Sequence, residues 1–298
     1  MNTIVARGAV LILLSELFFV LMGTQVRAAA QGLNNEMVVF FRNLFGLQIL
    51  IPLLYQHGLG ALKTQRKRLH LMRGLFGLTA MYCFFYAIAN LPLANAMILK
   101  MSAPLFIPLI AWLWLKEKLN RLILFVVLLG FIGVALIIQP DLSGMDEIAL
   151  IALAGGFFAA LAKTTVKNLT STEQPATIVF YFALTGLVVS SLPAFLNWQT
   201  PDLAEFGHLL LVGLFAASGQ YFMTQGYARA PASQISHYSY SSILYASLAG
   251  WLLWDEWMNT WAWIGALLVV VSGILLLRIR TDPLQEQALK KNQLTTET

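Results

Sequence analysis

Apolar residues run along this chain in long blocks that are separated by short polar or proline-containing connectors. A block of about 20 apolar residues is long enough to cross the roughly 30 Å of hydrocarbon in a bilayer as a helix. This pattern predicts an all-α polytopic membrane protein. Ten helices are expected, at residues 8–28, 37–56, 73–91, 94–115, 121–139, 147–168, 175–195, 206–228, 232–254 and 258–278.

The second half of the chain repeats the first with an offset of 139 residues. The aligned pairs include Gly74 with Gly213, Tyr82 with Tyr221, Pro92 with Pro231, Trp112 with Trp251, and Glu117 with Glu256. A unit of five helices starts and ends on opposite sides of a membrane, so the second copy runs upside down relative to the first. We therefore predict two inverted five-helix repeats, at 6–139 and 147–278, followed by a polar tail at 281–298.

Composition agrees with a membrane location, because only 11% of the residues are charged, whereas soluble domains carry about 25%. The mean hydropathy is +0.72. Positive charge collects at one set of helix ends, which the positive-inside rule assigns to the cytoplasm together with both termini and the tail. These cations are Arg7, Lys63, Arg66, Lys67, Arg68, Arg73, Lys116, Lys118, Arg121, Lys167, Arg229, Arg278, Arg280, Lys290 and Lys291. The other set of ends has Arg27 alone, so the net charge of +5 reflects topology and does not indicate nucleic-acid binding.

Motifs for enzymatic chemistry are absent from the sequence. Cys83 is the single cysteine, which excludes an internal disulfide and a thiolate metal site. The four histidines are scattered, and phosphate-binding, zinc-protease and serine-hydrolase motifs do not occur. We therefore expect no catalytic residues, no metal and no cofactor.

Polar side chains are distributed unevenly among the predicted helices. The helices at 121–139 and 258–278 are almost wholly apolar and should face lipid or each other. The hairpins 73–91/94–115 and 206–228/232–254 are equivalent under the repeat and are rich in polar residues, which must face protein or water. We expect them to converge around a substrate cavity. The candidate substrate-binding residues are Lys100, Tyr82, Tyr86, Asn90, Tyr221, Gln225, His237, Tyr240 and Ser241, with Arg42 on the helix at 37–56.

Glu16 is the one carboxylate deep within a predicted span, where a charge is costly unless it is paired or protonated. It is either a protonatable coupling site or a partner of Arg42 or Lys100. Each of those two cations either receives a carboxylate or snorkels outward. His237 is either a packing residue or linked to protons.

Other polar residues near helix ends have structural interpretations. Lys163 is interpreted as an interfacial anchor, and Glu117 and Glu256 as helix-end pairings. Pro104 and Pro108 are expected to bend the helix at 94–115.

Several of these motifs resemble the EamA domain of the drug/metabolite transporter superfamily. They are Arg73-Gly74-Leu75-Phe76, the turn Leu91-Pro92-Leu93-Ala94-Asn95-Ala96, Ser102-Ala103-Pro104-Leu105-Phe106 and Lys116-Glu117-Lys118, with second copies through Tyr227 to Ala232 and Trp254-Asp255-Glu256. The resemblance covers residues 6–278 and implies two EamA repeats in a bacterial-type inner membrane.

The resemblance and the polar hairpins favour secondary active transport of a small metabolite. Cationic groups outnumber the buried carboxylate, so we expect an anionic or zwitterionic substrate such as an amino acid or carboxylate, with export favoured by the resemblance. The alternatives are import or exchange of a nucleotide-like or cofactor-like metabolite, multidrug export, and a channel. Further expectations are protons as the coupling ion, no nucleic-acid partner, and a monomer or weak homodimer.

Overall fold

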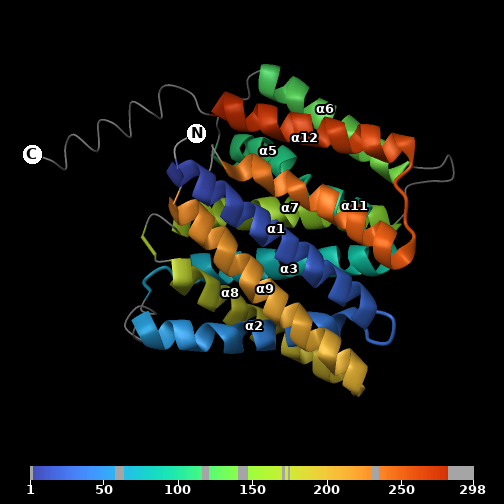
Figure 1. Ribbon diagram of the computed structural model, residues 1–298. Coiled ribbons are helices and arrows are strands. Elements are labelled where there is room, and N and C mark those ends of the chain that lie inside the picture. The colour runs from blue at the N-terminus through green and yellow to red at the C-terminus, as the bar shows by residue number, and fades with distance from the viewer. Residues whose placement is uncertain are drawn as a thin grey trace, which may run out of the picture.

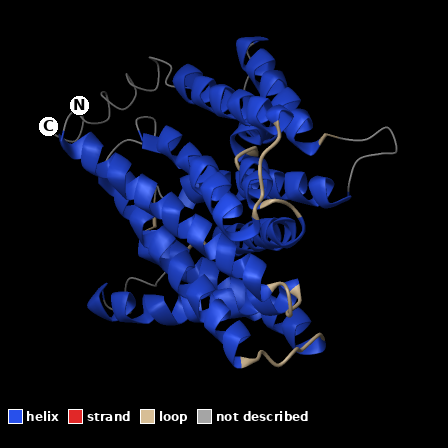
Figure 2. Ribbon diagram, turned by 45° about the vertical axis from the view of Figure 1, so that its right-hand side comes forward, coloured by secondary structure: helices blue, strands red, loops and turns tan. Residues whose placement is uncertain are grey.

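The structure is a computed structural model that describes residues 3–57, 64–115, 121–139, 147–169, 172–173, 175–229 and 235–280. Within these ranges the regular elements are all helices, joined by short loops (Figure 2). The first half contains α1 (Thr3–Ala29), α2 (Asn35–His57), α3 (Lys67–Asn90), α4 (Leu93–Lys100), α5 (Ala103–Leu115) and α6 (Arg121–Ile138). The second half contains α7 (Glu147–Leu169), α8 (Pro175–Leu196), α9 (Leu203–Arg229), the 3₁₀-helix η2 (Ser236–Tyr240), α11 (Ser241–Trp254) and α12 (Thr260–Arg280).

Within the described residues, seven segments are long and apolar enough to cross a membrane, which makes the chain a multi-pass membrane protein. They are Ala6–Ala29, Lys67–Asn90, Leu93–Ile110, Arg121–Ile138, Glu147–Val166, Thr177–Leu196 and Leu203–Met223, and a shorter apolar helix covers Thr260–Leu276. These seven segments do not establish ten membrane spans. That α2, η2 with α11, and α12 also cross the membrane stays a prediction.

The helix predicted at 94–115 is divided into two helices. α4 ends at Lys100 and α5 begins at Ala103, with Met101 and Ser102 in a turn between them. Pro104 fits the new start, because proline lacks a backbone N–H and is well tolerated in the first turn of a helix. Pro108 lies inside α5. The Ser102 hydroxyl closes the turn by donating to the carbonyl of Leu99 at 2.6 Å.

The helix predicted at 232–254 is irregular at the equivalent place. Its first residues lie outside the described ranges, and residues 236–240 form η2 before α11 begins at Ser241. Five serine and tyrosine residues of this region lie in a row, and serine side chains compete with helical hydrogen bonding. The Ser242 hydroxyl, for example, donates to the carbonyl of Ser239 at 2.9 Å.

The helix pairing is symmetric under exchange of the two halves. Exchange converts the pair α1 with α9 into α7 with α3, α2 with α9 into α8 with α3, α1 with α11 into α7 with α5, and α1 with η2 into α7 with α4, and all of these pairs are in contact. The pairs α6 with α12 and α2 with α8 are converted into themselves. Figure 1 shows α6 and α12 side by side along one edge of the bundle and α2 along the opposite edge.

Close packing of α6 on α12 confirms that the two most apolar predicted helices face each other. A Cβ added at Gly133 would lie 2.7 Å from the carbonyl oxygen of Gly265 and 2.8 Å from the Cβ of Leu268. Small residues at such positions let two membrane helices approach closely. The outer faces of both helices are exposed and apolar, with Phe125 63% and Leu267 62% exposed, as expected for a lipid-facing surface.

Candidate functional site

Side chains from four different elements interact around Glu16; Lys100 and Ser239 are half-buried, and Lys163 is exposed. Glu16 of α1 is 5% exposed. Its carboxyl accepts a hydrogen bond from the Ser239 hydroxyl of η2 and interacts electrostatically with the ammonium groups of Lys100 on α4 and Lys163 on α7. We call these four residues the central charged cluster.

The position of Glu16 follows from the way α1 packs on α9. A Cβ added at Gly219 of α9 would lie 2.8 Å from the Phe19 ring, so glycine permits this approach. Ser15 donates a hydrogen bond to the Gly219 carbonyl at 2.9 Å. With Ser15 committed to α9, the neighbouring Glu16 is directed toward α4, α7 and η2.

Lys100 lies at the end of α4, directly before the turn that divides the predicted fourth helix. Its Nζ atom is 4.9 Å from the ring centroid of Phe19 and 4.8 Å from that of Phe84. Two aromatic faces stabilise an ammonium group where water is scarce. Lys100 therefore faces inward toward Glu16, and the snorkelling alternative does not describe it.

Two buried polar atoms, one in the central charged cluster and one two residues after Ser239, lack a hydrogen-bond partner among the described residues. They are Oε2 of Glu16 and Oγ of Ser241. Buried polar groups almost always have partners, and exceptions need a specific explanation. A bound substrate or an ordered water would provide one.

Only some of the predicted substrate-binding residues lie at the central charged cluster. Tyr86 is 37% and Tyr221 47% exposed, and the exposed Asn90 donates a hydrogen bond to the Tyr86 carbonyl of its own helix at 2.8 Å. Tyr240 is buried, and its hydroxyl occupies the space where a side chain at Gly273 of α12 would lie.

The remaining predicted residues lie at other helix interfaces. Tyr82 is half-buried, its hydroxyl has no partner among the described residues, and its carbonyl accepts a hydrogen bond from the Asn35 side chain. Gln225 is half-buried and has a bonded partner. The His237 ring packs on Tyr238 with centroids 4.3 Å apart.

Arg42 is buried, but it contacts neither Glu16 nor Lys100. Its Nη1 donates to Oδ1 of Asn43 at 3.0 Å, and its guanidinium lies 5.4 Å from the centroid of Phe182 on α8. It therefore belongs to the α2–α3–α8 interface and not to the central charged cluster.

Glu256 forms the helix-end pairing that was expected of it. Its carboxylate binds Arg27 of α1 through both oxygens, with one contact of 2.8 Å from Nη1 to Oε2. Oε2 also accepts the backbone N–H of Leu93, the first residue of α4, at 3.1 Å. The Arg27 guanidinium lies 4.6 Å from the centroid of the Trp254 ring. This outer clamp, made by Arg27, Glu256 and the Leu93 amide, ties together the ends of α1, α4 and α11. Glu117 lies outside the described residues.

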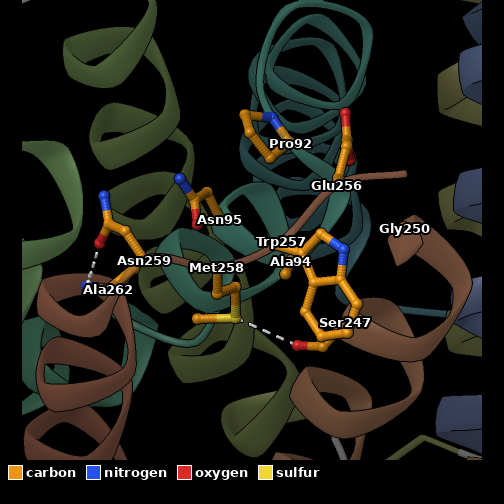
Figure 3. Close-up of a pocket in the computed structure, with 10 residues that line it drawn as sticks. All are labelled: Pro92, Ala94, Asn95, Ser247, Gly250, Glu256, Trp257, Met258, Asn259 and Ala262. Carbon is orange, nitrogen blue, oxygen red and sulfur yellow. Dashed lines mark hydrogen bonds between the residues drawn. The ribbon is translucent and has the colours of Figure 1, made fainter. Parts of the chain in front are cut away.

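A pocket of about 120 Å³ opens beside the outer clamp (Figure 3). Residues of the α4 start, of α11 and of the connector to α12 line it: Pro92, Ala94, Asn95, Ser247, Gly250, Glu256, Trp257, Met258, Asn259 and Ala262. Hydrogen bonds from Ser247 to the Met258 sulfur and from the Ala262 amide to Asn259 stabilise the connector. The pocket borders the clamp and does not include the central charged cluster.

Lys163 and Ser239 were not among the predicted site residues. Lys163 was interpreted as an interfacial anchor; its side chain is exposed, and it also interacts electrostatically with both Glu16 and Lys100. For Ser239 a signal was present, since it lies 139 residues after Lys100 and is its equivalent in the repeat. The two equivalent positions thus approach the same carboxyl from opposite halves.

Ionisable side chains buried inside a multi-pass helical bundle mark substrate or ion pathways. The fold and the cluster together define the class of protein: a polytopic membrane transporter. The chain belongs to the EamA-like transporter family, whose model matches residues 6–139 and 147–278. This match confirms the resemblance to two EamA repeats.

Relatives named as transporters cover most of the chain. It is 31% identical over 275 residues to the pseudopaline exporter of Pseudomonas aeruginosa, which covers 92% of this chain and 96% of that protein. It is 27% identical to the riboflavin transporter of Brucella anthropi, covering 86% of this chain and 93% of that one. It is 26% identical to the S-adenosylmethionine uptake transporter of Rickettsia felis, covering 82% and 83%. The protein is accordingly a transporter of small molecules and not an enzyme.

One solved crystal structure shares the fold. It matches with a TM-score of 0.65 at 17% sequence identity, and the match covers 93% of this chain and 99% of the other.

Proposed function

We propose that the protein is a secondary active exporter of a small anionic or zwitterionic metabolite, such as an amino acid or a carboxylate. The observation that supports this most is the central charged cluster, which draws on α1, α4, α7 and η2. These four elements form two pairs that are equivalent in the repeat. A site built jointly by both halves can be exposed to either side when the halves move against each other.

The charge of the cluster supports an anionic group on the substrate. Two ammonium groups, of Lys100 and Lys163, face one carboxyl, that of Glu16. A substrate carboxylate would balance the second ammonium. The unpartnered Oγ of Ser241 adds a hydrogen-bonding group for the same substrate.

Alternating access by two inverted repeats is the proposed mechanism. Helix pairing that is symmetric under exchange of the halves supports it, as does the irregular backbone at the equivalent positions 101 and 240. In this proposal ten helices form two repeats, at 6–139 and 147–278, and enclose a cavity bounded by α1, α3, α4, α7, α9 and η2 with α11. The excess of cations at one set of helix ends supports the proposed location of both termini and of the tail at 281–298 in the cytoplasm, with the protein in a bacterial inner membrane.

Glu16 is the proposed proton-coupling residue. A carboxyl that is buried beside two cations can alternate between pairing with Lys100 and carrying a proton when the substrate replaces it. The pseudopaline exporter among the relatives supports export. The riboflavin and S-adenosylmethionine transporters favour a second candidate function, import or exchange of a cofactor-like metabolite.

A reconstituted transport assay tests the proposal. A stabilisation screen of the purified protein with amino acids, carboxylates and nucleosides first selects the substrate. Lys100→Ala should then weaken binding of a carboxylate substrate by about 1.5 to 3 kcal/mol, the range for a hydrogen bond to a charged group. Lys67→Ala, at an exposed position of α3, is the matched control and should bind normally. Normal binding by Lys100→Ala, or a preference for cations, would contradict the charge argument.

Proton coupling is tested with Glu16→Gln in the same vesicles. We expect loss of transport driven by a pH gradient together with preserved substrate exchange, because glutamine is nearly isosteric but carries no proton. Unchanged gradient dependence would rule out Glu16 as the coupling residue.

A channel is distinguished by labelling of single cysteines beside Tyr82 and beside Tyr240. Alternating access predicts reciprocal changes at the two positions when substrate is added. Labelling of both positions from both sides in every condition would favour a channel.

A further inference from the structure

Two arginine side chains from different helices converge on one phenylalanine at the α2–α3–α8 interface. The guanidinium of Arg73 on α3 lies 4.2 Å from the centroid of Phe182, and that of Arg42 on α2 lies 5.4 Å from it. The two guanidinium groups are close enough to act on each other electrostatically. Two positive charges that lie against the same ring repel each other, so the arrangement is unfavourable unless a negatively charged group accompanies it.

An acidic partner is missing for both arginines among the residues that the structure describes. Ion pairs in these ranges join Arg27 to Glu256 and His70 to Glu173. Arg42 is 7% exposed and has Asn43, a neutral side chain, as its hydrogen-bond acceptor. The buried Nε of Arg73 has no acceptor. A buried charge without a counter-charge is strongly destabilising, and proteins avoid it unless a ligand compensates.

The surroundings hold both guanidinium groups in place. The Asn43 amide nitrogen donates to the Val39 carbonyl at 2.8 Å, which leaves its Oδ1 to face Arg42. A Cβ added at Gly77 would lie 2.8 Å from the Phe182 ring and would collide with Nη1 of Arg73. Glycine at this position therefore makes room for the guanidinium against the ring.

We propose that Arg42 and Arg73 form a binding site for one anionic group, a carboxylate or a phosphate, separate from the central charged cluster. Guanidinium groups bind both anions through paired hydrogen bonds, and two of them converging on an apolar wall match a single oxyanion. The anion belongs either to a soluble metabolite or to the headgroup of an anionic lipid lodged between α2, α3 and α8. This site does not depend on the proposed transport mechanism.

The depth of Arg42 and Arg73 in the membrane is compatible with an anion from a soluble metabolite and with one from a lipid headgroup. Arg42 follows the first residue of α2 by seven positions and Arg73 follows that of α3 by six, which is about 9 to 10 Å at 1.5 Å per residue. Because α2 and α3 begin on opposite faces of the membrane in the proposed topology, the two arginines enter from opposite faces and meet within the hydrocarbon region. A soluble anion reaches such a depth through a water-filled path, and a lipid phosphate reaches it when the headgroup is drawn inward between α2, α3 and α8.

The test measures the thermal stability of the full-length purified protein with defined anions. Wild type, Arg42→Gln, Arg73→Gln and the control Arg68→Gln are compared, since Arg68 lies on the same helix as Arg73 but is exposed. Sodium phosphate is titrated against sodium chloride at equal ionic strength. In a second arm, nanodiscs of phosphatidylglycerol are compared with nanodiscs of phosphatidylcholine. Phosphate salts stabilise proteins generally, so the readout is the difference between each variant and wild type.

For a soluble anion, phosphate should raise the Tm of wild type and Arg68→Gln, with an apparent Kd at least tenfold weaker in Arg42→Gln and Arg73→Gln. For a lipid anion, phosphatidylglycerol should stabilise wild type and Arg68→Gln but not the other two. In the absence of both anions, Arg73→Gln should be at least as stable as wild type, because it removes an uncompensated charge. The proposal is overturned if all four proteins respond equally in both arms, or if Arg73→Gln is less stable than wild type without anions and keeps the wild-type response.

Discussion

The outer clamp offers the sharpest test of the geometry, because one carboxylate serves three helix ends. Glu256 binds Arg27 through both oxygens and accepts the Leu93 amide at 3.1 Å. The backbone presents Glu256 in this position, because Asp255 adopts a left-handed conformation with φ of 54° at the end of α11. Glu256→Gln retains an acceptor for Leu93 but removes the charge that Arg27 binds.

The size of the effect follows from the exposure of the pair. The two side chains are 19% and 20% exposed, so the pair lies between an exposed ion pair, worth about 0 to 1 kcal/mol, and a buried one, whose disruption costs about 3 to 5 kcal/mol. We expect a coupling energy of about 2 kcal/mol between Arg27 and Glu256, within the range for hydrogen bonds between charged groups. This corresponds to roughly a 30-fold change in the unfolding equilibrium constant, since 1.4 kcal/mol is tenfold.

A double-mutant cycle measures this coupling. The free energy of unfolding in mixed detergent micelles is determined for wild type, Arg27→Gln, Glu256→Gln and the double variant. Arg121→Gln, at an exposed position of α6, replaces Arg27→Gln in a control cycle and should be additive with Glu256→Gln. If the Arg27 and Glu256 effects add to within about 0.5 kcal/mol, the clamp contributes nothing measurable and the reasoning is wrong.

Two further predictions concern helix packing and the cluster. Gly265→Ala would place a Cβ 2.5 Å from the Gly133 carbonyl oxygen, so it should destabilise the protein by about 1 to 3 kcal/mol through overpacking. Gly207→Ala, whose Cβ meets nothing within 4 Å, should be neutral or stabilising by up to about 1 kcal/mol from helix propensity. Equal free energies of unfolding for Gly265→Ala and Gly207→Ala would contradict the α6–α12 contact. Lys163→Gln should lower the initial transport rate in vesicles at least tenfold, whereas Lys67→Gln should not. A wild-type rate for Lys163→Gln would return Lys163 to the role of an interfacial anchor.

Much of the fold was accessible from the sequence because it depends on composition and spacing. Helix length and apolar content identify a multi-pass protein, and the 139-residue offset pairs equivalent positions without any structure. That 121–139 and 258–278 face lipid or each other followed from their lack of polar side chains, and the structure shows that they do both. The pairing of Glu256 at a helix end followed in the same way, from its place beside a predicted boundary.

The sequence offered Lys100 or Arg42 as partners of Glu16. Only the tertiary structure decided between them and added Lys163. A helix turns by about 100° per residue, so the polar content of a helix does not tell which side faces the interior. Tyr86 and Tyr221 therefore proved exposed, although they lie on the predicted hairpins. Lys163 interacts electrostatically with Glu16 because α7 packs against α3, α4 and α5.

The arginine pair illustrates the same limit. Arg73 was counted with the cations that set the orientation of the chain, and Arg42 with the candidate substrate ligands, in segments 31 residues apart. What brings them together is the position of Phe182 on α8 and the space left by Gly77. The sequence by itself determined that these arginines lie in or near the membrane. Only the packing of α2, α3 and α8 determined that they share one site, because a shared site depends on how each helix is rotated and which helices touch. No local sequence pattern encodes either property.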